Sequence, residues 1–398
     1  MFDGKAMLLL KGAETWAPEA LGAQDILVGG GRILALARDI TVPPPLVRTI
    51  DGRGLLAVPG FIDGHVHLLG GGGEGGFASR TPELRFGDAA RAGITTLVGC
   101  LGTDGVTRSL ESLLAKTRSL DEQGISSFML SGSYGIPPHT LTGSVERDLL
   151  LIDKVIGTGE LALSDHRSSQ PSFEAFLRIV AECRRGGMLS GKAGVVTVHL
   201  GDGSRGMDLL RRMAAETEIP RTQVWPTHVN RNPELFMEAI AFAKAGGFVD
   251  ITTSGVPRFY QTGTVEPAAA LRRLLEAGVD PGRPTFTSDG QGSLPVFEPD
   301  GSLSGLSVGG VDSLSQSFRD AVQVEGIGME HALRAVTANP AAVLRLADRG
   351  RLETGRRADL LLLHQATLAI HTVVSAGRIL VEDGIQRVFG AFEEEASQ

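Results

Sequence analysis

Two histidines separated by one residue end an apolar run near position 60. The segment reads Val58-Pro-Gly-Phe-Ile-Asp-Gly-His65-Val66-His67, and a glycine-rich stretch follows it. Side chains two residues apart on a β-strand point to the same face, so both imidazoles can reach one ligand. Histidine is the commonest metal ligand in proteins. The pair predicts a metal site, and the plainer alternative is two polar residues that merely end a strand.

Three further apolar segments end in residues that can bind metal. His199 ends Val195-Val-Thr-Val-His199, His228 follows Val224-Trp-Pro-Thr, and Asp289 follows Thr285-Phe-Thr-Ser. A carboxylate, Glu160, precedes the segment Leu161-Ala-Leu-Ser-Asp-His-Arg167 and is expected at the start of a strand. Chance is a poor explanation for four histidines and an aspartate at matching strand ends, so we predict a metal centre there.

The elements that position these residues alternate between strands and helices. Such alternation predicts an α/β fold, and eight evenly spaced repeats favour a (β/α)8 barrel of the TIM type, whose active sites lie at the carboxyl ends of the strands. A doubly wound sheet is the alternative. Strands are expected near residues 56–61, 95–100, 126–130, 161–164, 194–199, 223–227, 248–252 and 284–287, and helices over 109–122, 172–185, 207–216, 233–245, 266–277 and 330–346.

Both ends of the chain consist of short apolar segments joined by glycine turns. Residues 25–36 are typical of a hairpin, and residues 358–364 and 373–384 repeat the pattern. We therefore predict a small β-sandwich domain built from residues 1–56 and 347–398. Residues 57–346 are then the barrel that carries the metal-dependent chemistry.

Composition excludes several classes of protein. The chain has 398 residues, of which 42% are hydrophobic and 21% charged, with a net charge of −8. Because no block of like charges occurs, neither a nucleic acid nor an anionic membrane is an expected partner. Two cysteines, Cys100 and Cys183, predict no disulfide framework. No apolar run is long enough for a membrane span or a signal sequence, so a cytoplasmic location is expected.

These motifs resemble the isoaspartyl (β-aspartyl) dipeptidases of the amidohydrolase superfamily. The two histidines at 65 and 67 alone indicate only the superfamily. The segments Gly70-Gly-Gly-Gly-Glu74, Ser164-Asp-His-Arg167 and Thr227-His-Val-Asn-Arg231-Asn are typical of the dipeptidases. The resemblance extends over nearly the whole chain, including the small β domain.

The resemblance implies a metallo-dipeptidase with two divalent metals, usually zinc, that share a hydroxide. His65, His67 and Asp289 would hold the more buried metal, and His199 and His228 the other. The physical reason is that a metal lowers the pKa of water to about 7 in good cases, so that water can attack an amide. Asp289 would also carry the proton from this water to the leaving amine.

The resemblance also implies roles for residues that surround the metals. Tyr134 would stabilise the oxyanion, a donor aimed at developing charge. Glu74 is suited to a substrate ammonium, and Arg167 and Arg231 are suited to carboxylates, which guanidinium groups bind in pairs of hydrogen bonds. The pocket would be completed by Gly72, Thr103 and Ser293. The implied partner is a small dipeptide with a β-aspartyl linkage, and the implied assembly is a homo-oligomer.

The chain departs from this family at Glu160, which stands where the family has a carboxylated lysine that bridges the metals. One residue is also inserted between Ile156 and Glu160. Glu160 would either bridge the metals itself, or the bridge is lost and the site holds one metal. We favour the bridge, because a buried carboxylate without a partner is costly.

Two other functions fit the sequence less well. A cyclic-amide or N-acyl amidohydrolase, such as a dihydroorotase-like enzyme, has no substrate ammonium to match Glu74. A non-catalytic scaffold with the amidohydrolase fold would be expected to have lost metal ligands, whereas here only the lysine is replaced.

Overall fold

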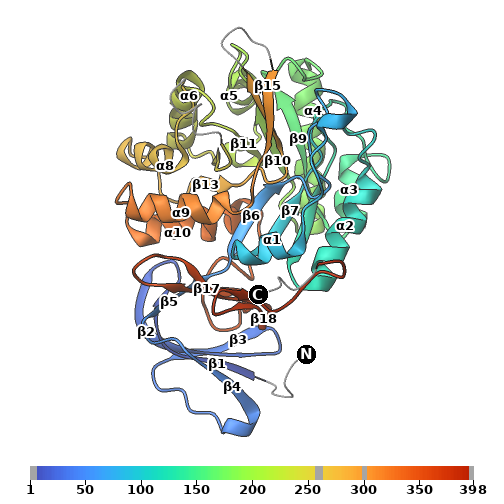
Figure 1. Ribbon diagram of the computed structural model, residues 1–398. Helices are drawn as coiled ribbons and strands as arrows, with labels where there is room; N and C mark the ends of the chain where they lie inside the picture. Colours follow the sequence, from blue (N-terminus) through green and yellow to red (C-terminus); the bar gives the residue numbers. More distant parts are fainter. Residues whose placement is uncertain (1–6, 256–262, 298–302, 394–398) are drawn as a thin grey trace.

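The structure, a computed structural model, describes residues 7–255, 263–297 and 303–393. It consists of a barrel surrounded by helices and a sheet that lies against one end of the barrel (Figure 1). Strands from the first and last parts of the chain form this sheet, so the barrel is an insertion between them. None of the helices in the described ranges combines the length and the hydropathy that crossing a membrane requires.

Eight parallel strands form the barrel. Six of them pair in chain order as one sheet, and the last two, β12 and β13, pair as another. Backbone hydrogen bonds join the sheets on both sides, from Val229 N–H to the Asp250 carbonyl (3.3 Å) and from Asp289 N–H to the His65 carbonyl (3.1 Å). The predicted TIM-like α/β fold is therefore confirmed. The strands are β6 (Phe61–Val66), β7 (Ile94–Gly99), β8 (Ser126–Ser131), β9 (Val155–Leu163), β10 (Val195–Leu200), β11 (Val224–Thr227), β12 (Val249–Thr252) and β13 (Pro284–Thr287).

Helices cover the outside of the barrel, and their starts follow ordinary capping rules. The side chains of Ser109, Ser172 and Asn232 each accept a hydrogen bond from a backbone N–H in the first turn of the helix that follows. The helices are α1 (Phe86–Arg91), α2 (Leu110–Gln123), α3 (Val145–Leu151), α4 (Phe173–Ser190), α5 (Asp208–Glu216), α6 (Pro233–Lys244), α8 (Pro267–Glu276), α9 (Ser313–Gln323), α10 (Met329–Val336) and α11 (Ala338–Val343), with single 3-10 turns at Pro44–Leu46, Phe77–Ser79 and Arg221–Gln223.

Three predicted boundaries were wrong. The first predicted strand, residues 56–61, merges the end of one strand with the start of another: Leu55–Pro59 is β5 of the other sheet, and β6 begins at Phe61. Both strands are fully buried, so their continuous apolar sequence has no period that marks the change. The predicted helix 330–346 is divided into α10 and α11 at Thr337, whose φ of −135° and ψ of −81° are not helical. The strand predicted at 161–164 begins at Val155, so Glu160 lies inside β9 rather than at its start.

The terminal sheet has nine strands and a hydrophobic cluster of its own. The predicted hairpin is present, because β2 and β3 pair antiparallel around Gly30 and Gly31, which both have positive φ values as a tight two-residue turn requires. A second layer, which a β-sandwich needs, and the domain boundaries at 56/57 and 346/347 stay predictions. The strands are β1 (Met7–Trp16), β2 (Ala20–Gly29), β3 (Arg32–Ala37), β4 (Val47–Asp51), β5, β16 (Leu360–His364), β17 (Ile370–Ser375), β18 (Arg378–Glu382) and β19 (Ile385–Gln386).

Candidate active site

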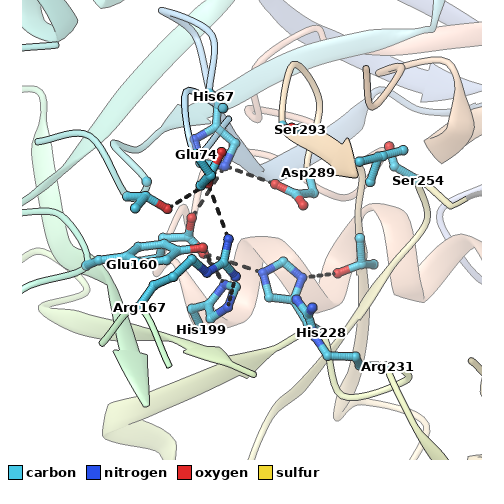
Figure 2. Close-up of a pocket in the computed structure, with 18 of the residues that line it drawn as sticks. His67, Glu74, Glu160, Arg167, His199, His228, Arg231, Ser254, Asp289 and Ser293 are labelled. Atoms are coloured by element: carbon cyan, nitrogen blue, oxygen red, sulfur yellow. Dashed lines mark hydrogen bonds and ion pairs between the residues drawn. The ribbon is translucent and has the colours of Figure 1, made fainter. Parts of the chain in front are cut away.

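A cavity of about 350 Å³ opens at the carboxyl ends of the barrel strands. Figure 2 shows the imidazoles, carboxylates and two arginines that line it. A hairpin of β14 (Ser293–Phe297) and β15 (Leu303–Val308) contributes Ser293 to one wall. Every predicted site residue except His65 lines this cavity: Gly72, Glu74, Thr103, Arg167, Arg231 and Ser293, together with His67, Tyr134, Glu160, His199, His228 and Asp289.

Glu160 lies at the centre of the four histidines. Its Oε2 is 3.1 Å from His199 Nδ1 and 3.4 Å from both His65 Nε2 and His228 Nε2. Its Oε1 is 3.4 Å from His67 Nε2. The carboxylate is 1% exposed, so water does not screen it from the imidazoles. One anionic group is thus shared by two pairs of histidines.

A bulge in β9 places Glu160 in this position. Thr158 pairs with Val196 of β10 and Leu161 pairs with Val198, so Gly159 and Glu160 both lie opposite Thr197. Two residues opposite one is the definition of a β-bulge, which changes the direction of a side chain. A Cβ on Gly159 would lie 2.5 Å from the Thr197 carbonyl oxygen, and φ there is +136°. The extra residue of the bulge therefore lies where only glycine fits.

The outer nitrogens of two histidines are held by neighbours that the sequence analysis did not assign to the site. His199 Nε2 lies 3.0 Å from Asp165 Oδ2, and His228 Nδ1 lies 2.6 Å from Thr252 Oγ1. These contacts orient the rings and leave His199 Nδ1 and His228 Nε2 facing Glu160. The motif Ser164-Asp-His-Arg167 contained a signal for Asp165, whereas nothing in the sequence marked Thr252.

Electrostatics set the charge of these groups. Burial alone would raise the pKa of Asp165, but hydrogen bonds from His199 and Arg167 outweigh burial and hold that pKa well below its usual range. Burial and the neighbouring His199 lower the pKa of His228 to about 3, so this imidazole is neutral at pH 7. A neutral imidazole is the form that binds a metal.

The donor set fits a metal site. His65 is 1% exposed, and neither of its ring nitrogens has a hydrogen-bond partner among the described residues. A buried polar group without a partner is rare in native proteins and calls for an explanation such as a bound ion. Asp289 Oδ1 lies 3.6 Å from His65 Nε2 and 3.0 Å from His67 Nε2, on the side of the cavity. Imidazole nitrogens and carboxylate oxygens are the ligands that zinc prefers.

Tyr134 follows β8 and points its hydroxyl at the histidine cluster. The Tyr134 hydroxyl lies 3.0 Å from His199 Nδ1, and the Arg167 guanidinium lies 5.4 Å from the centre of its ring. Burial and the charge of Glu160 raise the pKa of Tyr134 well above its ordinary value. The group is therefore a protonated donor at the floor of the cavity.

The two arginines of the pocket differ in how far they are already paired. Asp165 accepts from Arg167 Nε at 3.0 Å and from NH2 at 2.8 Å, and Glu74 accepts from Arg167 NH1 at 3.2 Å. Thr103 also donates to Glu74 at 2.9 Å. Arg231 has only a loose ion pair of 4.0 Å with the exposed Asp202, and its buried Nε has no partner among the described residues. Arg231 is therefore the guanidinium that is more available to a ligand.

Comparison with known proteins agrees with this geometry. The chain is 43% identical to a beta-aspartyl dipeptidase from Fervidobacterium islandicum AW-1, whose crystal structure was solved in complex with a beta-Asp-Leu dipeptide. The match covers 97% of this chain and 100% of the other, with a TM-score of 0.90. This chain belongs to the beta-aspartyl dipeptidase family.

More distant comparisons place the family within the amidohydrolases. The amidohydrolase family matches residues 262–380 of this chain. A curated protein, Deacetylase Atu3266 of Agrobacterium fabrum, is 27% identical over 350 residues, which cover 84% of this chain and 77% of the deacetylase. The structure of N-isopropylammelide isopropylaminohydrolase from Burkholderia multivorans superimposes with a TM-score of 0.64 at 20% identity, which shows a shared fold alone.

The predicted wall residues Gly72 and Ser293 lie next to one another. Gly72 has a φ of +71°, and a Cβ there would lie 2.6 Å from the Ser79 carbonyl oxygen and 3.1 Å from Ser293 Cβ. Only glycine lets the backbone pass this close to the Ser79 carbonyl oxygen. The structure thus brings every predicted site residue except His65 to the lining of one cavity and places His65 beside Glu160, while the roles given to these residues stay predictions.

Proposed function

We propose that this chain is a metal-dependent hydrolase of β-aspartyl dipeptides. The observation that carries the proposal is one cavity with metal-binding side chains at its floor and groups of opposite charge on its walls. A β-aspartyl dipeptide has one ammonium and two carboxylates around its scissile amide, and Glu74, Arg167 and Arg231 offer the matching charges. The beta-aspartyl dipeptidase relative at 43% identity supports this substrate class.

The metal is proposed to be zinc, held as two ions. His65, His67 and Asp289 would hold one ion, His199 and His228 the other, and Glu160 would be shared between them. The position of Glu160 within 3.1–3.4 Å of nitrogens from all four histidines supports sharing over a mononuclear site. A divalent metal lowers the pKa of water toward neutrality and polarises a carbonyl, which is the chemistry that amide hydrolysis needs.

The residues around the scissile bond would handle protons and developing charge. Asp289, at the side of the cavity, would accept a proton from the attacking water and pass it to the leaving amine nitrogen. Tyr134 would donate a hydrogen bond to the carbonyl oxygen as it becomes an oxyanion. Its protonated hydroxyl at the cavity floor supports this role.

Arg231 would bind a substrate carboxylate directly. Arg167 is already held by Asp165 and Glu74, so it would act in a network whose Glu74 faces the substrate ammonium. We expect this division because a guanidinium with one loose partner exchanges it for a substrate carboxylate at less cost than a guanidinium with two close ones.

The alternatives are weaker. A cyclic-amide or N-acyl substrate, as in a dihydroorotase-like enzyme, leaves Glu74 without a cation to bind. A non-catalytic scaffold does not explain why the histidine cluster and the carboxylates converge on one cavity. A homo-oligomeric assembly and a cytoplasmic location remain expectations of the sequence.

A substrate panel on the zinc-loaded protein tests the proposal. The panel contains β-Asp-Leu, the α-linked isomer Asp-Leu, and dihydroorotate, with zinc content measured on the same sample. We expect hydrolysis of β-Asp-Leu, much slower cleavage of Asp-Leu, and loss of activity when a chelator removes zinc. Cleavage of dihydroorotate alone, or β-Asp-Leu hydrolysis that survives complete removal of metal, would contradict it.

A further inference from the structure

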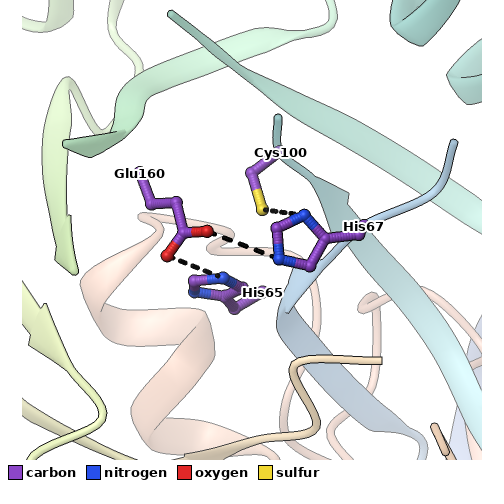
Figure 3. A group of neighbouring side chains, drawn as sticks. All are labelled: His65, His67, Cys100 and Glu160. Atoms are coloured by element: carbon purple, nitrogen blue, oxygen red, sulfur yellow. Dashed lines mark hydrogen bonds and ion pairs between the residues drawn. The ribbon is translucent and has the colours of Figure 1, made fainter. Parts of the chain in front are cut away.

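Cys100 lies beside the histidine cluster and is not part of the ligand set described above. It directly follows β7 and is fully buried. Its Sγ lies 3.9 Å from His67 Nδ1 and 3.7 Å from the Val66 carbonyl oxygen. Figure 3 shows the sulfur beside one ring nitrogen of His67, Nδ1, and the Glu160 carboxylate beside the other, Nε2, with His65 next to the same carboxylate.

The four side chains in Figure 3 form a compact set of donors. One ligand atom from each of His65, His67, Cys100 and Glu160 can be chosen so that all four atoms lie within 4.8 Å of one another. Nitrogen, sulfur and oxygen are all donors that zinc takes in proteins, and Asp289 would be the fifth protein donor of this set. The ring nitrogens of the buried His65 make no hydrogen bond among the described residues, although two carboxylates lie 3.4 and 3.6 Å from its Nε2, and this arrangement suits a bound cation.

We propose that the Cys100 sulfur is a ligand of the metal bound by His65 and His67. The inference rests on the proposed metal-dependent function and adds one residue to its metal site. A thiolate at this end of the site favours zinc, cobalt or cadmium over magnesium and manganese, which prefer oxygen ligands. The other end, with Glu160, His199 and His228, has no sulfur donor. The two ends are therefore chemically different.

A second reading assigns Cys100 only to the outer nitrogen of His67. In that case the sulfur contacts Nδ1 and orients the ring, as Asp165 does for His199. The two readings differ in one measurable distance, because a zinc–sulfur bond is about 2.3 Å long and zinc–nitrogen bonds are about 2.0–2.1 Å. Loss of an outer partner costs about 10–100-fold in metal affinity, so loss of a ligand should exceed this range.

X-ray absorption at the zinc edge of the zinc-loaded protein distinguishes them. The wild type, Cys100→Ser and Cys183→Ser are compared. Cys183 is the matched control, since it is equally buried but its Sγ contacts the Val195 carbonyl oxygen at 3.4 Å, outside the cluster. We expect a sulfur neighbour at about 2.3 Å in the wild type and in Cys183→Ser but not in Cys100→Ser, with zinc affinity lowered more than about 100-fold in Cys100→Ser alone.

The wild-type spectrum keeps the test decisive even if Cys100→Ser folds poorly. Only nitrogen and oxygen neighbours around zinc in the wild type would overturn the assignment, as would a sulfur neighbour that persists in Cys100→Ser. Cobalt substitution gives an independent readout, because a sulfur ligand adds a charge-transfer absorption in the near ultraviolet. A spectrum without sulfur, together with zinc-dependent cleavage of β-Asp-Leu, would reject the Cys100 ligand and leave the proposed function standing.

Discussion

Replacing Arg231 tests the substrate-binding half of the proposed function without disturbing the metal half. Arg231 lines the cavity, and its guanidinium pairs only loosely with Asp202 at 4.0 Å. Its backbone N–H donates to the His228 carbonyl at 3.0 Å, a contact that a side-chain substitution keeps. Arg231→Met removes the charge and keeps an unbranched apolar stem, while Arg231→Lys keeps the charge and removes the planar fork. We expect metal content to stay at the wild-type value in both variants.

The size of the effect follows from the kind of bond that is lost. A hydrogen bond to a charged partner contributes roughly 1.5–3 kcal/mol. At about 1.36 kcal/mol per tenfold change, Arg231→Met should lower kcat/KM for β-Asp-Leu by about 10- to 150-fold. The kcat/KM of Arg231→Lys should lie between that of the wild type and that of Arg231→Met, since a lysine binds a carboxylate as a point charge and not through two parallel bonds.

The assay pairs each protein with two substrates, β-Asp-Leu and its C-terminal amide. If Arg231 binds the C-terminal carboxylate, Arg231→Met lowers kcat/KM for β-Asp-Leu but not for its C-terminal amide. If it binds the α-carboxylate of the aspartyl residue, the loss is the same for both substrates. Arg178→Met, at an exposed position on α4, is the control. A kcat/KM for Arg231→Met within twofold of the control on both substrates would refute the reasoning.

Three further changes probe the metal bridge, the oxyanion donor and a buried carboxylate. Glu160→Ala should lose one metal and most activity, whereas the wild type should load two metals in bicarbonate-free buffer, since glutamate is ionised without carbon dioxide; two metals per chain in both proteins would contradict the bridge. Tyr134→Phe should lower kcat by about 10²–10³ with metal content unchanged, and a kcat within twofold would make Tyr134 structural. Burial raises the pKa of Asp250 to about 6 in spite of hydroxyl groups that donate to it, so its ionisation costs the folded state stability as pH rises from about 4 to about 6. In urea unfolding, the free energy of unfolding of Asp250→Asn should therefore rise by about 3 kcal/mol relative to that of the wild type between pH 4 and pH 7. A difference between the two proteins that does not change with pH would show that Asp250 keeps its ordinary pKa.

Residue type and strand position predicted most of the site. His199 ends a strand-like run, and parallel strands of a barrel bring their carboxyl ends to one face, so the sequence position of His199 alone placed it. His65 and Asp289 followed in the same way, and all three lie at one cluster. Arg231 and Glu74 were placed by motifs of a family rather than by any local rule, because their contacts depend on loops whose paths sequence patterns do not determine.

The residues that were missed have a common physical reason. Asp165 and Thr252 act on the outer nitrogens of histidines, and Cys100 lies in an apolar context that is equally typical of an ordinary core cysteine. A side chain that contacts the outer nitrogen of a metal-binding histidine is not marked by a fixed sequence spacing, because that histidine lies on another strand. Only the fold shows that Cys100 faces the same point as His65.

The bulge in β9 explains together the insertion predicted before Glu160 and the glutamate itself. Strand side chains alternate with a period of two, so one added residue would turn every following side chain of β9 to the opposite face. Leu161 and Leu163 are nevertheless buried in the core outside the site, and Leu161 still pairs with Val198. The bulge at Gly159 accommodates one extra residue of β9 between the pairs Thr158–Val196 and Leu161–Val198, as such an insertion requires. We propose that this bulge is how Glu160 presents its carboxylate to the histidines at a position where the resemblance predicts a longer, carboxylated lysine.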